Sequence, residues 1–359
     1  MLCTTYNAMK ICYFGTYSSN YTRNKVNITG LRENGIEVVE CNVNSGGLKK
    51  HWDLFWKHWP LRGKYDVMIV GFNGHAIMPV AWLVTRFPRK KLVFDAFIST
   101  YDSNIFDRKK HSPYSLMALK YWIIDWLSCT LADLVLMDAE AHADYMSKTF
   151  HIPRQKIKSL LVGCPSDTMY PRPKRESFDF IVHFHGTYIP VQGIPYVIKA
   201  AKILDGKGVK FNIVGKLSTY KESLDLAKEL DIKNVRFFDY MPYEKLAEFM
   251  ADADVCLGAF GDTEKAKRTG IFKIVEAMAM KKPVITGDSP ALREFLTDKK
   301  DVLFCRLADS QDLADKILEL KNNVTLRNSI AENGFELYKH KLTPKMIGKE
   351  LINILVTRI

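Results

Sequence analysis

Short apolar runs alternate with amphipathic segments along the first third of the chain. The runs expected to be strands cover residues 11–15, 36–41, 67–71, 92–97 and 134–138. The clearest helix between them is predicted from Ser115 to Ala132, and residues 16–27 are predicted as a polar loop entering a helix that ends near Gly35. Continuous apolar strands separated by helices are typical of a parallel sheet covered on both faces. We therefore predict an α/β domain over residues 1–166.

The same alternation restarts after a polar, proline-containing segment, which we predict to be a linker and hinge at residues 167–178. Further strands are expected at residues 180–185, 211–215, 235–238, 255–259 and 284–285. These form a second parallel α/β domain over residues 179–341, and residues 342–359 are expected to be a helix that packs back on the first domain. Ligands bind beyond the carboxyl ends of parallel strands. The pattern thus predicts two domains facing each other across a cleft.

The most informative stretch is KAKRTGIFKIVEAMAMKKPVITGDSP, residues 265–290. It opens with the cations Lys265, Lys267 and Arg268, and continues as a helix in which Glu276 is surrounded by apolar residues. A carboxylate in that setting is costly unless it is paired or serves a ligand. A glycine-containing loop that feeds a helix amino terminus among cations suits a phosphate. The alternative is a core helix whose glutamate pairs with a lysine.

Two strand ends of the second domain carry glycines that could admit a diphosphate. Gly186 and Thr187 end one strand and precede Gln192-Gly193, and Gly215-Lys216 repeats the arrangement one unit later. Backbone amides and Lys216 could bind phosphate there, although a tight turn alone would also explain the glycines. Tyr240-Met241 follows a further strand and could border a nucleobase, and the alternative is a core aromatic.

The first domain offers candidates at its own strand ends. They are Gly15, Thr16, Tyr17, His75, Asp95 and Asp102. We expect them to face an acceptor substrate, with capping or turn residues as the alternative.

Composition narrows the class of protein. The chain has 359 residues, 47% of them hydrophobic, and a net charge of +12, which favours an anionic partner. No apolar run approaches the roughly 20 residues of a membrane span, the first ten residues lack the pattern of a signal peptide, and the seven scattered cysteines indicate a reducing compartment. We therefore expect a cytoplasmic protein.

Basic and aromatic residues occur together at residues 49–52, 56–59 and 86–91. This composition suits peripheral binding to the anionic inner face of the plasma membrane. The alternative is a core helix whose tryptophans pack beneath a solvated basic face. Without a recognisable motif, we expect no nucleic-acid partner.

The two-domain plan, together with KAKRTGIFKIVEAMAMKKPVITGDSPALREF, resembles the retaining glycosyltransferases of family 4 (glycosyl transferases group 1), which have the GT-B fold of two Rossmann-like domains. MKICYFGTYSSNYTRNK resembles the family's opening strand and loop. HFHGTYIPVQGIPYVIKAAKIL resembles the entry to its second domain, and VRFFDYMPYEKLAEFMADADVCLGAF resembles its base-binding strand and the following helix.

This resemblance implies roles for single residues. Glu276 matches the glutamate that holds the ribose hydroxyls, Gly186 the phosphate loop, and Tyr240-Met241 the edge of the base. Arg268 stands where many members have a second glutamate, and a subset shares this arginine together with the lysine at Lys273. Thr187 and Gln192 replace the family's arginine and lysine. Phosphate charge then falls to other cations, namely Lys216, Lys265, Lys267, Arg268 and Lys273, while Asp95, Arg268 and Lys273 are the expected catalytic residues.

The implied function is transfer of a sugar from a nucleotide-diphosphate sugar to a glycan or lipid-linked acceptor hydroxyl, with retained configuration, in cell-envelope polysaccharide or glycolipid synthesis. No cofactor and no metal are expected. Two alternatives stay open: a sugar-nucleotide epimerase or hydrolase on the same fold, and a non-catalytic sugar-nucleotide-binding protein.

Overall fold

The computed structural model describes residues 9–18, 20–216 and 219–358 of the chain. It divides into two compact units. Unit 1 comprises Met1–Ile105, Lys109–Pro165 and Thr343–Ile359, and unit 2 comprises Phe106–Arg108 and Ser166–Leu342. The residues on which the signal-peptide expectation mainly rests, 1–8, lie outside the described part.

Unit 1 is built on a parallel sheet with the strand order β2-β1-β3-β4-β5-β6. Its strands are β1 (Lys10–Gly15), β2 (Glu37–Asn42), β3 (Val67–Val70), β4 (Lys91–Phe97), β5 (Leu134–Met137) and β6 (Ile157–Ser159). Its helices are α1 (Thr22–Glu33), α2 (Lys49–His58), α3 (Met78–Val84), α4 (Leu116–Leu131), α5 (Glu140–Phe150) and α13 (Pro344–Arg358). The predicted strands of this domain are confirmed, and β6 is an addition.

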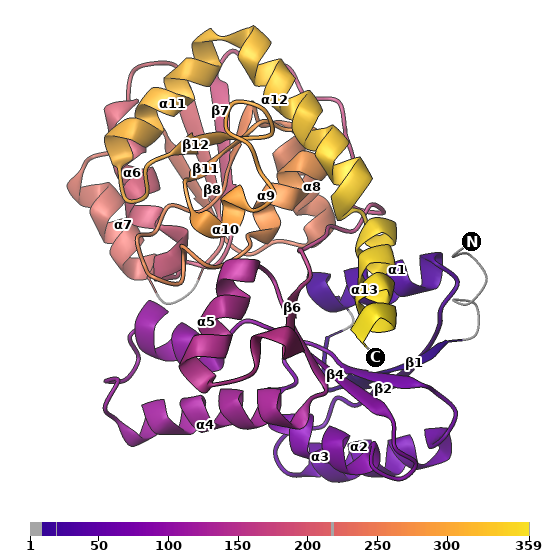
Figure 1. Cartoon of the computed structure of the whole chain (residues 1–359). Coiled ribbons are helices and arrows are strands. Elements are labelled where there is room, and N and C mark those ends of the chain that lie inside the picture. Colours follow the sequence, from indigo (N-terminus) through magenta and orange to yellow (C-terminus); the bar gives the residue numbers. More distant parts are fainter. Residues whose placement is uncertain (1–8, 19, 217–218, 359) are drawn as a thin grey trace. The chain divides into compact units, whose positions relative to one another are not determined.

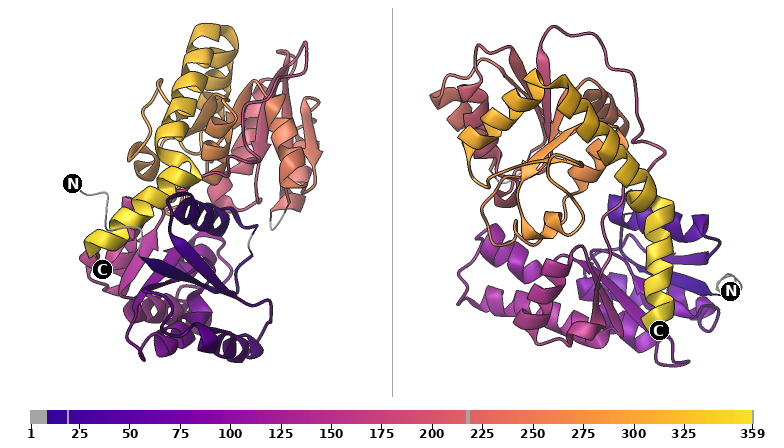
Figure 2. Two further views of the ribbon diagram at one scale, coloured as in Figure 1. Left: turned by 90° about the vertical axis from the view of Figure 1, so that its right-hand side faces the viewer. Right: turned by 45° about the horizontal axis from the view of Figure 1, so that its top comes forward.

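Two apolar cores fill the two faces of this sheet. One core joins the sheet to buried residues of α2, α3, α4 and α5, such as Leu54, Met78 and Cys129. The other contains Leu31 of α1 and Leu351 of α13, and Figures 1 and 2 show α13 lying alongside α1. The last helix of the chain thus completes the cover of the first sheet.

The prediction that the polar loop extends to Asn27 is wrong, because α1 already begins at Thr22. Arg23, Asn24 and Asn27 are buried in this helix although they are polar. Their N–H groups donate to Asp95 and to backbone carbonyls inside the unit. These partners lie far away in the sequence, so the local pattern resembled a loop.

Unit 2 repeats the parallel arrangement with the strand order β12-β11-β10-β7-β8-β9. Its strands are β7 (Phe180–His185), β8 (Val209–Val214), β9 (Val235–Phe238), β10 (Val255–Leu257), β11 (Val284–Gly287) and β12 (Leu303–Cys305). Its helices are α6 (Ile194–Ile203), α7 (Tyr220–Glu229), α8 (Tyr243–Ala251), α9 (Phe272–Ala279), α10 (Pro290–Arg293), α11 (Ser310–Asn322) and α12 (Val324–Leu337). The two parallel six-stranded sheets confirm the predicted fold class.

The polar segment expected as a linker lies with unit 2. Lys174 forms an ion pair with Asp254, and Arg175 forms one with Asp252. These two ion pairs hold the segment against the residues that precede β10.

Candidate functional site

A buried carboxylate and a buried amine lie one helical turn apart on α9. The residues are Glu276 and Lys273, and each is only 5% exposed. Positions three apart share one side of a helix, and both side chains reach the carboxyl end of β7. The structure thus places two opposite charges at the strand ends where parallel sheets bind ligands.

Both carboxylate oxygens of Glu276 accept hydrogen bonds. His185 Nε2 donates to Oε2 over 2.7 Å, and the Tyr243 hydroxyl donates to Oε1 over 2.6 Å. Burial raises the pKa of Glu276, but the hydrogen bond and charge of His185, with Tyr243 and Lys273, outweigh it and hold the pKa below its usual value. Glu276 is therefore an ionised acceptor of hydrogen bonds.

A second histidine continues this network into the sheet. His183 and His185 are two residues apart on β7, and His183 Nε2 lies 3.1 Å from His185 Nδ1. This hydrogen bond couples the orientation of the His183 ring to that of His185, which donates from Nε2 to the carboxylate. Burial, then the charges of His185 and Lys273, lowers the pKa of His183 well below its usual value. A neutral His183 thus fixes the ring orientation of His185.

The amine of Lys273 contacts an amide oxygen and an aromatic ring. Its Nζ donates to Gln192 Oε1 over 2.5 Å and lies 3.6 Å from the centre of the Phe184 ring. Burial lowers the pKa of Lys273 well below its usual value, with Glu276 acting in the opposite direction. An added anion would favour the protonated amine, so this side chain is poised to respond to a phosphate.

The glycines at the ends of β7 and β8 lie where an added side chain would collide with neighbouring atoms. A Cβ on Gly186 would lie 2.8 Å from Lys273 Nζ, and one on Gly215 would lie 1.9 Å from the Gly186 carbonyl oxygen. Their N–H groups already donate to Val214 and Phe238 carbonyls over 3.0 and 2.9 Å. The expectation that these amides approach a diphosphate therefore needs correction, because they are used within the sheet.

The cations before α9 have acidic neighbours. Lys265 is buried with its Nζ 3.9 Å from Asp107 Oδ2, and Asp107 also accepts from the Val191 amide over 3.0 Å. Lys267 pairs with Glu264, and Arg268 Nη1 lies 3.9 Å from that same carboxylate. The loop is thus held by charge pairing.

The remaining predicted residues of unit 2 surround this centre more loosely. Lys216 is exposed and lies 3.5 Å from Asp239. Tyr240 is 68% exposed, which excludes the core-aromatic alternative, while Met241 and Thr187 are half-buried. Gly193 adopts a positive φ of 68° as the residue before α6.

In unit 1, Asp95 occupies a buried ion pair. Arg23 donates to its carboxylate over 2.9 to 3.2 Å, and Asn27 donates over 2.9 Å. Both charged side chains are at most 1% exposed. This placement accounts for Asp95 without a catalytic role.

His75 and Asp102 are also buried. His75 Nε2 lies 3.5 Å from Asp125, and its ring meets the Phe94 ring edge-on at 4.9 Å. Burial lowers the pKa of His75, against the charge of Asp125. Asp102 lies in the turn after β4, where its amide donates to Ser99 Oγ over 3.0 Å.

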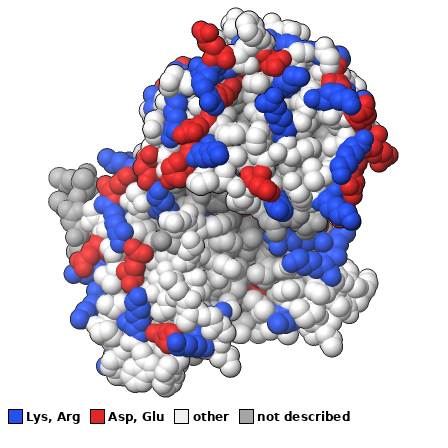
Figure 3. All heavy atoms as spheres, turned by 180° about the vertical axis from the view of Figure 1, so that it is seen from behind, with Lys and Arg blue, Asp and Glu red and all other residues white. Residues whose placement is uncertain are grey.

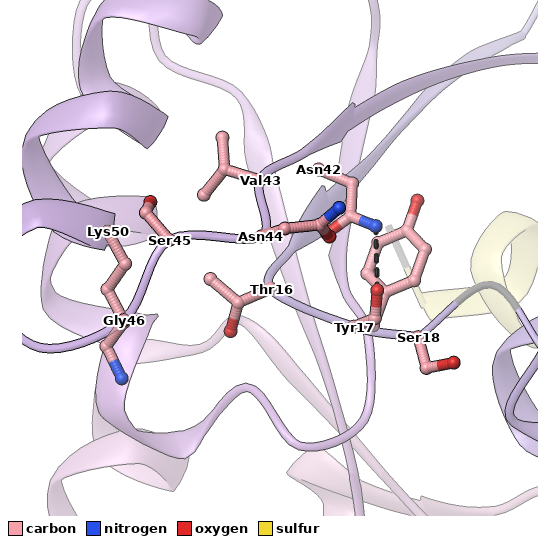
Figure 4. Close-up of a pocket in the computed structure, with 9 residues that line it drawn as sticks. All are labelled: Thr16, Tyr17, Ser18, Asn42, Val43, Asn44, Ser45, Gly46 and Lys50. Carbon is pink, nitrogen blue, oxygen red and sulfur yellow. Dashed lines mark hydrogen bonds between the residues drawn. The ribbon is translucent and has the colours of Figure 1, made fainter.

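Thr16 and Tyr17 line a polar cavity of about 640 Å³ in unit 1 (Figure 4). Opposite them lie Asn42, Asn44 and Lys50, at the end of β2 and the start of α2. Asn42 donates to the Tyr17 carbonyl over 2.7 Å. Gly15 precedes this loop at the end of β1, and a Cβ on it would meet the Tyr17 ring at 2.8 Å.

The sequence analysis missed His185, Tyr243 and Asp107. Alternation along a strand places His183 and His185 on one face, so the run HFH signalled a polar pair within a buried strand. Tyr243 lies two residues after Met241, within the stretch that resembles the family's base-binding region. Nothing local distinguishes Asp107, because its partners lie more than eighty residues away.

Comparison with known proteins gives likenesses over part and over all of the chain. Residues 170–337 match the sequence model of the family described as glycosyl transferases group 1. An uncharacterised glycosyltransferase of Methanocaldococcus jannaschii is 28% identical over 156 residues, 44% of this chain and 42% of that protein. The capsular polysaccharide biosynthesis glycosyltransferase CapM of Staphylococcus aureus is 24% identical over 180 residues, 48% of this chain and 45% of that protein.

The chain thus spans less than half the length of these curated relatives. A solved structure of Anabaena HepE in complex with UDP and glucose covers 97% of this chain and 100% of its own, with a TM-score of 0.72 and 17% identity. The group 1 match thus applies to residues 170–337, and the structural likeness shows the GT-B fold for the chain.

Proposed function

We propose that this protein is a retaining glycosyltransferase that moves a hexose-type sugar from a nucleotide-diphosphate donor to an acceptor hydroxyl in cell-envelope polysaccharide or glycolipid synthesis. The observation that carries the proposal is the pair Lys273 and Glu276 at the carboxyl end of β7. CapM, a similar protein, is named for capsular polysaccharide biosynthesis, and the solved HepE structure contains UDP.

In this proposal Glu276 binds the ribose of the donor. An ionised carboxylate can accept from two neighbouring hydroxyls. Ribose hydroxyls would replace or share the present donors, His185 and Tyr243. Tyr240 and Met241, just before Tyr243, then border the base.

The diphosphate would lie beside Gly186 and Lys273, which are so close that a Cβ on the glycine would lie 2.8 Å from the amine. The approaching anion favours the protonated form of Lys273, and Arg268 adds a second cation. The amino terminus of α9 contributes its positive dipole end. These groups stabilise the charge that develops as the sugar–phosphate bond breaks, which is the largest contribution that such a site can make.

We propose that retention follows from attack on the same face from which the diphosphate leaves. The diphosphate oxygen then takes the proton of the acceptor hydroxyl, so no protein nucleophile is required. The acceptor is assigned to unit 1, where the polar cavity with Thr16, Tyr17 and Lys50 suits a hydroxyl-rich molecule.

The test begins with thermal-shift screening of nucleotide sugars, with UDP-sugars first, followed by incubation of the stabilising donor with glycan and lipid-linked acceptors. A product whose anomeric configuration, read from proton NMR couplings, equals that of the donor supports the proposal. Inverted configuration removes the retaining assignment. Consumption of donor without an acceptor would indicate an epimerase or hydrolase, and binding without any turnover would indicate a sensor.

A further inference from the structure

The outer side of the α2–α4 layer of unit 1 exposes an unusual amount of aromatic and aliphatic surface. Trp52, Trp56 and Trp59 follow the spacing i, i+4, i+7 along α2 and its end, and they are 64%, 51% and 49% exposed. Leu54 and His58, on the opposite side of this helix, are buried in the unit. The tryptophans therefore point away from the core, which excludes the alternative in which they pack beneath a basic face.

The next helix continues this surface. Trp82, Leu83 and Phe87 on and after α3 are exposed, whereas Met78 and Val84 face the core. Since α2 contacts α3 and α3 contacts α4, the three helices form one continuous layer on the sheet, as the lower part of unit 1 in Figure 1 shows.

A row of exposed apolar side chains along α4 completes this surface. Leu116, Leu119, Ile123 and Trp126 are exposed, and their spacing of three, four and three places them along one side of the helix. Five of the six tryptophans of the chain are exposed on this layer. We call the exposed apolar side chains of α2, α3 and α4 the tryptophan face. Apolar surface of this extent marks an interaction site.

The charges around the tryptophan face are almost all positive. Residues 48–64 contain five cations, Lys49, Lys50, Lys57, Arg62 and Lys64, and one acid, Asp53. Residues 82–91 contain four cations and no acid. The Arg62 guanidinium lies 4.4 Å from the Trp59 ring centre, and that of Arg86 lies 5.1 Å from the Trp82 ring centre. In the space-filling view, unit 1 shows broad white areas with both blue and red side chains among them (Figure 3).

We propose that the tryptophan face is a docking surface for an anionic lipid bilayer. Indole rings prefer the interfacial zone of a membrane, and lysine and arginine beside them match its negative surface potential. A nucleic acid would use the cations but would leave Leu83, Leu116 and Leu119 exposed to water. No helix of the described residues has the length and apolarity that a membrane span requires, so the protein would lie on the bilayer surface.

This proposal stands apart from sugar transfer, because no residue of the Lys273 and Glu276 site takes part in it. The tryptophan face and the proposed acceptor cavity share only helix α2. Lys50 lines the polar cavity, and Trp52 begins the tryptophan row two residues later. A lipid-linked acceptor with its headgroup in this cavity would have its lipid at the bilayer surface.

The experiment measures co-sedimentation of the full chain with vesicles of phosphatidylcholine, with and without phosphatidylglycerol. Binding to the anionic vesicles alone is expected, with loss between about 0.1 M and about 0.5 M salt. Brominated lipid should quench tryptophan fluorescence in the bound state. The triple variant Trp52→Ser, Trp56→Ser, Trp59→Ser should lose binding by more than about tenfold and retain the wild-type melting temperature.

Two variants with the same change in net charge test whether the cations beside the tryptophan face, rather than the net charge of the protein, determine vesicle binding. Lys49→Glu, Arg62→Glu, Lys64→Glu should weaken binding by more than about tenfold. The same reversal at the exposed Lys199, Lys210 and Lys228 of unit 2 should leave it nearly unchanged. Equal loss in both variants, equal binding to neutral vesicles, or no binding at low salt would overturn the proposal. So would single-stranded RNA binding, or dimerisation in sedimentation equilibrium, that the tryptophan variant abolishes.

Discussion

Lys273 and Glu276 lie one turn apart on α9 and are both buried, but burial dominates the pKa of Lys273 alone. Glu276 keeps its charge because His185 and Tyr243 donate to both oxygens. Lys273 has one short hydrogen bond, to a neutral amide oxygen, so burial dominates its pKa. Burial therefore lowers the pKa of Lys273, whereas hydrogen bonds hold the pKa of Glu276 below its usual value.

This contrast predicts proton uptake on donor binding. Burial lowers the pKa of Lys273 and an approaching diphosphate raises it, so donor binding is linked to protonation of this amine. Affinity for UDP should fall as pH rises. Calorimetry in buffers of different ionisation enthalpy should reveal the uptake, which Lys273→Met should abolish. Binding enthalpies that are independent of the buffer in the wild-type protein would contradict this assignment.

A second prediction concerns the carboxylate. Glu276→Gln should weaken nucleotide binding between about tenfold and about a hundredfold, because charge-assisted hydrogen bonds contribute about 1.5–3 kcal/mol each. Tyr243→Phe should cost less than about tenfold, since the carboxylate remains. Titration calorimetry checks both. The control is Glu244→Gln, an exposed carboxylate on the neighbouring α8, and equal losses in it and in Glu276→Gln would remove the special role of Glu276.

A third prediction tests Asp95. Asp95→Asn should destabilise unit 1 by about 3–5 kcal/mol, since it leaves the Arg23 charge buried without a partner. The double change Arg23→Met with Asp95→Leu should recover part of that loss. Urea unfolding gives the free energies. If the single variant instead unfolds like wild type and loses turnover, Asp95 is catalytic after all.

Several residues of the unit 2 site could be predicted from the sequence, but the side chains that they contact could not. Lys273, Glu276 and Gly186 carry local signals, namely charge within an apolar helix and glycine after a strand. Their links to Gln192 and Tyr243 depend on which strand ends adjoin in the folded sheet. In unit 1, Asp95 resembled a site residue at a strand end, because the buried Arg23 that satisfies it lies seventy-two positions away.

Among elements, long periodic segments were predicted well, whereas the two three-residue edge strands were not. Helix α4 was expected from Ser115 to Ala132 and runs from Leu116 to Leu131, with the Ser115 side chain accepting from the Ala118 amide as its cap. The edge strands β6 and β12 have three residues each. A segment of that length shows no periodicity, and only its pairing to a neighbouring strand defines it.

The contact between α1 and α13 gives a prediction for an element pair. A Cβ on Gly348 would lie 2.1 Å from the backbone carbon of Gly30, so the two helices touch through their main chains. Gly348→Val should separate them and destabilise unit 1 by at least about 1–3 kcal/mol. Gly46→Ala, whose added Cβ meets nothing within 4 Å, is the control. Equal melting temperatures of the two variants would show that the close contact contributes little.

For the molecule as a whole, the assignment of the donor to unit 2 predicts where a nucleotide protects the backbone. UDP at about a hundred times its dissociation constant should stabilise the bound fold by about 2.7 kcal/mol. Hydrogen exchange should slow at the end of β7 and along α9, while α2, α3 and α4 serve as an internal reference. Protection confined to those reference helices would place the nucleotide in unit 1.

The place of α13 in unit 1 has a consequence for biosynthesis. Residues from Ser166 to Leu342 leave the ribosome between the bulk of unit 1 and the helix that covers α1. The apolar side of α1, with Val26 and Leu31, therefore stays open to water while all of unit 2 is made. Unit 2 can fold as soon as its own sequence emerges, whereas unit 1 closes its core only when translation reaches α13. A nascent chain stalled before that helix would present the uncovered side of α1 to chaperones.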